Sequence, residues 1–309
     1  SNSSAKQSTY LPKEDIEEYI REGQLQKFKY SYEDDKESLE MLFADIDDPQ
    51  QTMEAIISKI IDATDPDFGG GKVNTWEGFR EKVDELSQKS QTQGRGTQRN
   101  SNEISVLSWR KFKRIVNKAI KNDDMFANRA DSSRHECRLA DAIKHISNND
   151  VYVIDVAKLT EDKQAFVFGD AVRTIGEYDG ESGINPPSRI IVFIDELNKY
   201  ASKDTPKYSP ILQEILDVTE RGRSLGVVLF GAEQFRSNIH QRVTGNCSTH
   251  AYGRTNSIET STKDYSSLPS TYKNMLTRLE QGDYLIQNPI FRSLLKIRFP
   301  KPIYKQFKK

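Results

Sequence analysis

The stretch Ser188–Glu196 reads SRIIVFIDE, and the interpretation of the whole chain starts from it. Its five apolar residues, Ile190–Ile194, are all β-branched or aromatic and run without a break into the carboxylates Asp195 and Glu196. Such a run predicts a strand buried on both faces, as in a parallel sheet covered by helices. Open α/β sheets bind their ligands at the carboxyl ends of strands. Two interpretations stay open here: a buried strand that ends in a solvated acidic turn, or an acidic pair that carries chemistry.

Composition sets the bounds for the rest. The chain has 309 residues, enough for one large or two ordinary domains, and a net charge of −1. There is no global basic signal for nucleic acid, so any DNA contact must come from local patches or from a ring that gathers loops of several subunits. The two cysteines, Cys137 and Cys247, lack metal-ligand spacing. With no membrane-length apolar run and no signal-peptide pattern, a cytoplasmic protein without a membrane partner is expected.

The sequence pattern divides the chain into three parts. Residues 1–34 form a polar segment whose first three residues, Ser-Asn-Ser, resemble the remnant of a purification tag. Residues 35–147 are helical by apolar spacing, with a polar stretch at 88–103 that we expect to be a mobile linker. Residues 148–304 alternate strands with helices, which predicts βαβ units. The expected fold is therefore α/β, a mostly parallel sheet flanked by helices, with a helical, insertion-like N-terminal half packed on it.

The strands of the last part follow from short apolar runs bounded by turn residues. The closing pair, separated by Asn288-Pro289, reads as a hairpin. The predicted strands are 151–156, 189–195, 226–231, 248–253, 284–287 and 293–299.

Two other motifs invite a functional reading. GGGK at Gly69–Lys72 is not a phosphate-binding loop, because Pro66 stands where that motif needs glycine and Val73 where it needs serine or threonine. A predicted helix at 106–121 is locally basic through side chains that could face DNA phosphates or form a solvated cationic face. The candidate DNA-contacting residues on it are Arg110, Lys113 and Arg114.

Three features follow the acidic pair in order. Arg221 and Arg223 end a helix before the next apolar strand, that strand runs to Gln234, and the following strand ends at Arg254. Because all lie at ends of adjacent strands or of connecting helices, we expect them to converge on one sheet edge. Phosphoryl transfer needs a carboxylate, a polar group that senses the γ-phosphate and an arginine fork for developing charge. Taken singly, the arginines could complement a helix C-terminus and Gln234 could bond a loop.

The ordered blocks resemble a known family. IIVFIDELNKY, ILDVTERGRSLGVVLFGAEQF and the strand ending at Arg254 are similar to the C-terminal half of a HerA/FtsK-type ATPase core, and the step of eleven residues from Arg223 to Gln234 matches that family's pattern. VYVIDVAKL at 151–159 and LEQGDYLIQNPIFRSLLKIRFPKP, ending at Pro302, resemble other HerA-like segments. The helices at 38–61 resemble the family more loosely. The resemblance implies a RecA-like α/β core.

The resemblance also implies roles for individual residues. Asp195 is the Walker B acid associated with Mg²⁺, and Glu196 is the acid that activates the attacking water. Gln234 is the polar sensor beside ATP, where Asp195 also acts. The arginines implied to reach a neighbouring subunit's nucleotide are Arg223, then Arg221, then Arg254.

Two departures from the family stand out. Many HerA-like proteins read DEAH, whereas this chain has Asn198 in the histidine position. More important, no G-x-x-x-x-G-K-[ST] motif occurs, so the amides, lysine and hydroxyl that hold phosphates are missing. Family order places that P-loop upstream of the helices at 38–61. We therefore expect either a fragment that begins after the P-loop or a subunit that has lost ATP binding.

The leading functional hypothesis is a HerA-like ATP-driven translocase or helicase on double-stranded DNA. It would act as a hexameric ring with ATP and Mg²⁺, beside a nuclease partner in DNA-end processing or phage defence. The alternative is a catalytically inert RecA-like module for oligomerisation or partner docking, including one whose P-loop comes from a partner subunit. A metal-dependent nuclease built on Asp155, Asp195 and Glu196 is a third reading, although no further lysine or acid stands at suitable spacing.

Overall fold

The computed structural model describes residues 13–43, 46, 48, 50–88, 104–121, 123–178 and 188–300. The tag-like start, all but the first residue of the predicted linker and the last residues of the closing segment lie outside these ranges. The α-helices are α1 (Lys13–Arg21), α2 (Tyr32–Asp35), α3 (Thr52–Ile61), α4 (Trp76–Gln88), α5 (Val106–Ile120), α6 (Leu139–Lys144), α7 (Glu161–Gly176), α8 (Pro210–Leu225), α9 (Gln241–Asn246), α10 (Ser257–Thr260) and α11 (Ser270–Leu276).

The strands and 3₁₀ helices are short. The strands are β1 (Lys27–Lys29), β2 (Glu136–Arg138), β3 (Ile190–Ile194), β4 (Val227–Gly231), β5 (His250–Tyr252), β6 (Asp283–Gln287) and β7 (Leu295–Arg298). The 3₁₀ helices are η2 (Lys36–Phe43), η3 (Ser132–Arg134), η4 (Leu197–Lys199), η5 (Arg236–Asn238) and η6 (Lys263–Tyr265). Among the described residues, no helix has the length and apolar character needed to cross a membrane.

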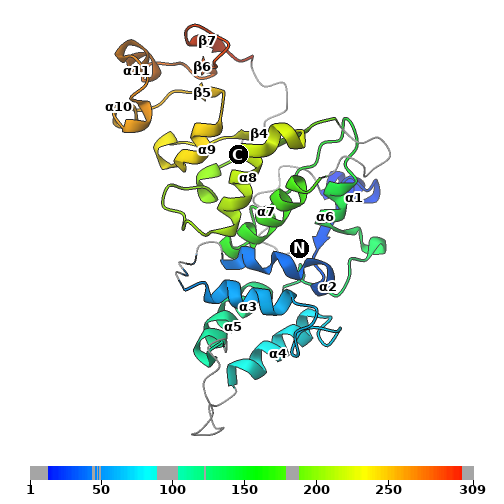
Figure 1. The fold of residues 1–309 in the computed structure, drawn as a ribbon. Helices are drawn as coiled ribbons and strands as arrows, with labels where there is room; N and C mark the ends of the chain where they lie inside the picture. Colours follow the sequence, from blue (N-terminus) through cyan, green and yellow to red (C-terminus); the bar gives the residue numbers. More distant parts are fainter. Residues whose placement is uncertain are drawn as a thin grey trace.

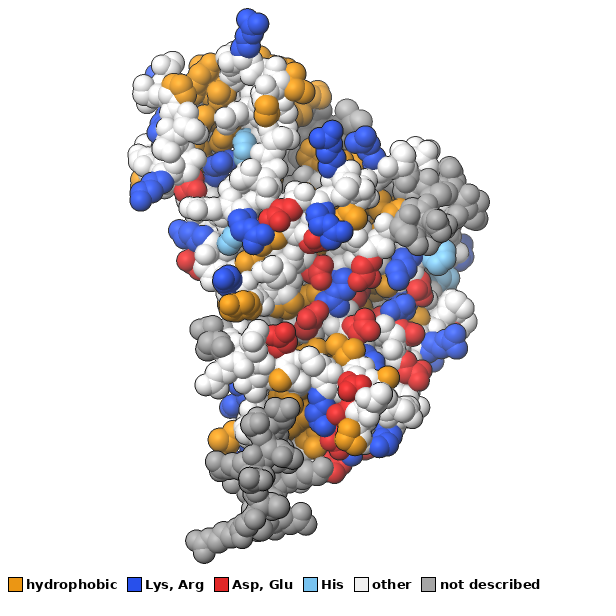
Figure 2. Space-filling view, in the orientation of Figure 1, with side chains coloured by type: hydrophobic (Ala, Val, Ile, Leu, Met, Phe, Trp, Pro, Cys, Tyr) orange, Lys and Arg blue, Asp and Glu red, His pale blue; other side chains and the backbone are white. Residues whose placement is uncertain are grey.

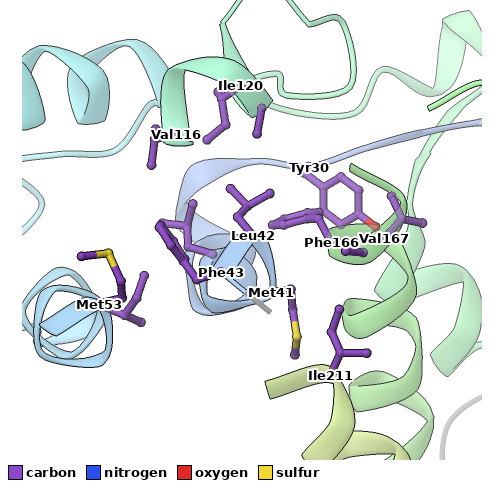
Figure 3. Close-up of a cluster of buried hydrophobic side chains, with 14 of the residues drawn as sticks. Tyr30, Met41, Leu42, Phe43, Met53, Val116, Ile120, Phe166, Val167 and Ile211 are labelled. Carbon is purple, nitrogen blue, oxygen red and sulfur yellow. The ribbon is translucent and has the colours of Figure 1, made fainter. Parts of the chain in front are cut away.

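The helical half packs on the α/β half through one continuous core, as the sequence predicted. Phe43 of η2 stacks on Phe112 of α5 at 5.0 Å between ring centroids, and Tyr30 meets Phe166 of α7 edge to face at 4.8 Å. Figure 3 shows these layers meeting, with Met41 beside Ile211 of α8. Burying so many aromatic and aliphatic side chains from both halves ties α7 and α8 to the N-terminal helices.

The predicted single, mostly parallel sheet is not present among the described residues. β3 and β4 pair in parallel from Ile190 opposite Val227 to Ile194 opposite Gly231. β5, β6 and β7 form a separate antiparallel sheet, and β1 pairs with β2 in a third. The closing hairpin is confirmed as β6 and β7. The fold is α/β with helices and small sheets. Among the described residues, β3, α8 and β4 form a parallel βαβ unit, and β1 and β2 are also parallel to each other.

The predicted strand at 151–156 is wrong. These residues form no ladder, and the side chains of Val151 and Val153 are 86% and 85% exposed. The Asp155 carboxylate accepts a hydrogen bond from the Ala157 amide at 3.0 Å, which turns the chain toward α7. The preference of residues for strands reflects how well they pack on a half-buried pleated surface. Apolar composition alone therefore does not make a strand where no neighbouring strand is available.

The prediction that β3 is buried on both faces is also wrong. Ile190 and Ile194 are 8% and 5% exposed on the side that packs on the helices, whereas Ile191 and Phe193 on the other side are 61% and 76% exposed. Phe193 stacks on Phe230 of β4 at 4.7 Å. One face of this two-stranded sheet is therefore covered by α7 and α8, and the other presents apolar side chains.

The C-terminal sheet has a small core of its own. Leu276 of α11, Leu285 of β6 and Tyr252 of β5 are buried together with Tyr265, Leu268 and Leu279. In Figure 1 this lobe lies beyond β4 and α9, at the end of the molecule opposite α4 and α5. Its attachment to the loop after β4 bears on the candidate site.

Candidate functional site

The acidic pair lies at the carboxyl end of β3, as predicted. Asp195 and Glu196 are both exposed there, and the Glu196 amide donates to Asp195 Oδ1 at 2.9 Å. The turn is bonded to the end of β4, because the Ala232 amide donates to the Ile194 carbonyl at 2.8 Å and the Leu197 amide donates to the Ala232 carbonyl at 3.1 Å. The parallel pairing thus brings the ends of both strands to one edge, with two carboxylates facing solvent.

Glu196 has a strained backbone. Its φ of 53° and ψ of 48° lie in the left-handed region, which residues other than glycine, asparagine and aspartate seldom occupy. Its carboxylate forms an ion pair with Lys199 of η4, in which both side chains are about half exposed. Strain of this kind concentrates at functional sites, because the surrounding structure must hold the residue in place. Here the holding contacts are the bonds to Ala232 and the side chain of Leu197.

Leu197 and Gly231 lock the turn against β4. Leu197 is 5% exposed, and a Cβ added at Gly231 would lie only 2.5 Å from Leu197 Cδ2. A side chain at the end of β4 would therefore force the buried Leu197 to shift, and glycine permits the close approach. The sequence suggested the apolar strand but contained no signal for this contact.

Gln234, the predicted sensor, lies three residues beyond β4 on the same edge as the acidic pair. It is exposed and makes no hydrogen bond within the described part of the chain. The structure therefore brings Asp195, Glu196 and Gln234 to one edge of the parallel unit, with all three polar ends accessible.

Glu233 is a candidate that sequence reasoning missed. The pKa of its carboxyl is raised to about 7, chiefly by burial and then by the Glu259 carboxylate, while Arg236 opposes the shift. Its Oε2 is buried and has no hydrogen-bond partner. A carboxyl group with a displaced pKa beside an exposed edge marks a functional candidate on physical grounds. The sequence signal was only its place next to Gln234.

Arg236 joins the loop after β4 to the C-terminal lobe. Its guanidinium donates to His250 Nδ1 at 2.8 Å and to the Asp264 carbonyl at 3.3 Å, and lies 5.7 Å from the ring centroid of Tyr252. Because burial and then Arg236 lower the pKa of His250 to about 4, this imidazole is neutral at physiological pH and its Nδ1 can accept. The neighbouring Ser237 donates to Glu259 through both its amide and its hydroxyl, at 2.9 and 2.7 Å.

Arg221 and Arg223 do not converge with the acidic pair, contrary to the prediction. Helix α8 runs antiparallel to β3 and β4, so its last turn lies where the strands begin, and the Ile190 amide donates to the Gly226 carbonyl at 3.0 Å. The paired strands β3 and β4, five residues each and about 13 Å long, lie between the end that holds the arginines and the end that holds Asp195. Arg221 pairs with Asp217, while Arg223 is exposed and forms no ion pair among the described residues.

Arg254 does not lie on a strand that pairs with β3 or β4. It follows β5, which pairs with β6 in the antiparallel sheet rather than with β4. Its side chain is exposed. The prediction that its strand neighbours β4 is therefore wrong for the described residues.

The basic face of α5 is partly occupied by contacts within the chain. Arg110 donates from Nε to the Ser87 carbonyl at 3.1 Å, and Lys113 forms an ion pair with Asp84 of α4. The pKa of Asp84 is lowered, chiefly by its hydrogen bond with Lys113. Arg114 is exposed. These contacts favour a structural role for Arg110 and Lys113, which fasten α5 to α4.

The GGGK stretch is a turn, in line with the sequence argument. Gly70 and Gly71 have φ of 63° and 73°, and the Lys72 ammonium donates to the Pro66 carbonyl. A Cβ at Gly69 would come within 2.3 Å of the Ala63 carbonyl oxygen. The loop closes on itself behind α3.

The edge that carries Asp195 and Glu196 is suited to a hydrated Mg²⁺ and not to a metal ion enclosed by protein ligands. Within the described ranges no three His, Cys, Asp or Glu side chains come together as a metal-binding group. Mg²⁺ keeps several waters and takes one or two carboxylates together with substrate phosphates. Asp195, exposed and with only Oδ1 engaged by the turn, meets that requirement. The residues that would hold ATP phosphates are not found in the sequence.

Comparison with known proteins yields structural likenesses only. No family model matches the chain, and no curated protein matches it in sequence. The genome packaging NTPase B204 from Sulfolobus turreted icosahedral virus 2, solved with ATP-gammaS, is similar with a TM-score of 0.37 and 17% identity, covering 53% of this chain and 72% of that one. The bacterial conjugative coupling protein TrwBdeltaN70 is similar with a TM-score of 0.43 and 11% identity, covering 90% of this chain and 72% of that one. At these values the likenesses establish neither family nor function for this chain.

Proposed function

We propose that the chain is the Walker B half of a HerA/FtsK-type ATPase that moves double-stranded DNA. The observation that carries the proposal is the exposed acidic pair at the carboxyl end of β3, with Glu196 held in the left-handed region beside the end of β4. In this role Asp195 holds hydrated Mg²⁺ and Glu196 accepts the proton of the attacking water. Gln234, on the same edge, hydrogen-bonds the γ-phosphate.

The exposed arginines support a site shared between subunits. Arg223 lies at the opposite edge of the parallel unit from Asp195, so it cannot serve the acidic pair of its own chain. A neighbouring copy in a ring would present Arg223, with Arg221 as a second candidate, to that pair. A planar guanidinium at this position neutralises charge on the transferring phosphoryl group. We include a hexameric ring, an interface role for Arg254 and a nuclease partner in this proposal.

The phosphate-binding half must come from another polypeptide segment. The parallel unit offers a place for it, because among the described residues the outer edge of β4 has no strand partner. One face of this two-stranded sheet is uncovered. The side chains of Ile191, Phe193 and Phe230 on it are 61%, 76% and 49% exposed. Parallel sheets are normally covered by helices on both faces. A strand along β4 and a helix over the phenylalanine pair would bring a P-loop to the edge that holds Asp195.

The decisive experiment compares two glutamate substitutions in the complete ATPase assembly. We expect Glu196→Gln to abolish phosphate release, with and without duplex DNA, while ATP binding by filter assay persists. Glu220→Gln is the matched control. Glu220 is an exposed acid near the C-terminal end of α8, and it pairs with Arg242. Normal turnover by Glu196→Gln would remove Glu196 from the mechanism.

An inert assembly module is the second candidate, and the missing phosphate-binding motif favours it. In that case the exposed phenylalanine face serves docking alone. An assembly that forms normally, binds no ATP and is unaffected by Glu196→Gln would decide for this reading.

A further inference from the structure

The segment between η4 and α8 repeats a pair of residues. Lys199-Tyr200 and Lys207-Tyr208 flank Lys203, which places a lysine at every fourth position. We name residues 199–209 the Lys–Tyr loop. It carries one acidic residue, Asp204, and it begins three residues after Glu196.

The cations of this loop are largely free to bind something else. Lys203 and Lys207 are exposed and form no ion pair within the described residues. The Lys207 ammonium lies 5.5 Å from the ring centroid of Tyr208, whose own exposure is 67%. Lys199 is the exception, since it pairs with Glu196. This differs from α5, where Lys113 and Arg110 are engaged by α4.

The backbone of the loop is held in place. Ser202 forms an isolated antiparallel bridge with Ile239, and the Lys203 amide donates to the Asn238 carbonyl at 2.9 Å. Ala201 is fully buried, and Gln213 Nε2 donates to the Lys207 carbonyl at 2.8 Å. The lysines therefore project from a fixed support, which lowers the entropic cost of ordering them on a partner.

A cavity of about 320 Å³ adjoins the loop. Lys199 and Tyr200 line it together with Gln164 of α7 and Ser209, which caps α8. The positive ends of two sixteen-residue helices thus face the same space. Glu161 also lines it and is the opposing charge. Figure 1 shows the chain bulging at the flank of α8 before that helix begins, and in Figure 2 blue and orange atoms adjoin on that flank.

We infer that the Lys–Tyr loop contacts the phosphate backbone of double-stranded DNA, with Lys203 and Lys207 on phosphates and Tyr208 against the adjoining sugar. Free lysines on a fixed support are the groups that neutralise phosphates and release counterions. The inference rests on the proposed DNA-handling function, and it places the DNA contact here rather than on α5. Lys199 belongs to both the loop and the Glu196 ion pair, so phosphate drawn to Lys199 would free the carboxylate that activates water.

The test is salt-dependent binding of a fluorescent 30-base-pair duplex to the intact chain. The variant is Lys203→Gln with Lys207→Gln, which leaves the Glu196–Lys199 pair untouched. Losing two phosphate contacts lowers the slope of log K against log salt by about 1.8 and weakens binding by about 60-fold at 0.1 M salt. The matched control, Lys111→Gln with Arg114→Gln, removes the same charge from α5 and should bind like the unmodified chain. Melting temperatures within about 2 °C of each other exclude misfolding as the cause.

Three outcomes oppose the inference. If the loop variant keeps the full slope, the loop is not the contact. If the α5 variant loses duplex binding and the loop variant does not, the contact lies on α5. If the unmodified chain binds no duplex even at 25 mM salt, the DNA partner itself is wrong. ATP turnover and the effect of Glu196→Gln are measured separately, so failure of the loop assignment leaves the ATPase proposal standing.

Discussion

The left-handed backbone at Glu196 predicts a measurable gain in stability when strain is removed. Glu196→Gly and Glu196→Gln both delete the carboxylate and hence the exposed pair with Lys199, which contributes at most about 1 kcal/mol. The two variants differ in the backbone. Placing an L-residue other than glycine at φ 53° costs about 1–2 kcal/mol, and the greater freedom of glycine in the unfolded chain offsets about 0.5–1 kcal/mol of that.

The glycine variant should therefore exceed the glutamine variant by about 1 kcal/mol in free energy of unfolding. Urea titration followed by far-UV circular dichroism measures the difference, and the two variants should share one m-value. A chain of this size should show a rise in melting temperature of about 2 °C per kcal/mol. If the glycine variant is no more stable than the glutamine variant, the strain is absent, and with it the argument that the fold holds this acid in a costly conformation.

Two further predictions concern the same edge. Gly231→Ala puts a Cβ 2.5 Å from Leu197 Cδ2 and should lower the free energy of unfolding by about 1–3 kcal/mol. The control is Gly245→Ala in α9, where a Cβ has nothing within 4 Å, so this variant should be neutral or stabilising. Equal melting temperatures for the two variants would contradict the close approach. The pKa of Glu233 is raised to about 7, so the folded chain holds this proton more tightly than the unfolded one, and stability should fall as pH rises from about 4.5 to 7. Glu233→Gln should flatten that fall, and unchanged pH profiles would refute it.

Periodicity was enough to locate the helical half. The apolar spacing of α3, with Met53, Ile56 and Ile60 buried, follows from local pattern because a helix buries one stripe of its own surface. The same holds for α5, where Trp109 and Phe112 face the core. Helices satisfy their backbone hydrogen bonds internally, so their existence depends little on distant residues.

Strands depend on distant partners, and there the sequence was less informative. The VYVIDV segment at 151–156 has strand composition but no ladder, and Ile191 and Phe193 of β3 are exposed although their run is continuous. Composition reports that residues can be buried on a sheet. It does not report which neighbour covers which face.

By itself, the sequence determined that an apolar strand ends in Asp195 and Glu196 and that Gln234 follows the next such strand. Tertiary structure decided which of the ordered residues meet. Parallel pairing of β3 with β4 brings the acids and Gln234 to one edge, while the antiparallel course of α8 carries Arg223 to the other. Strand direction and pairing are set by contacts between residues far apart in the chain, and order along the sequence does not contain them.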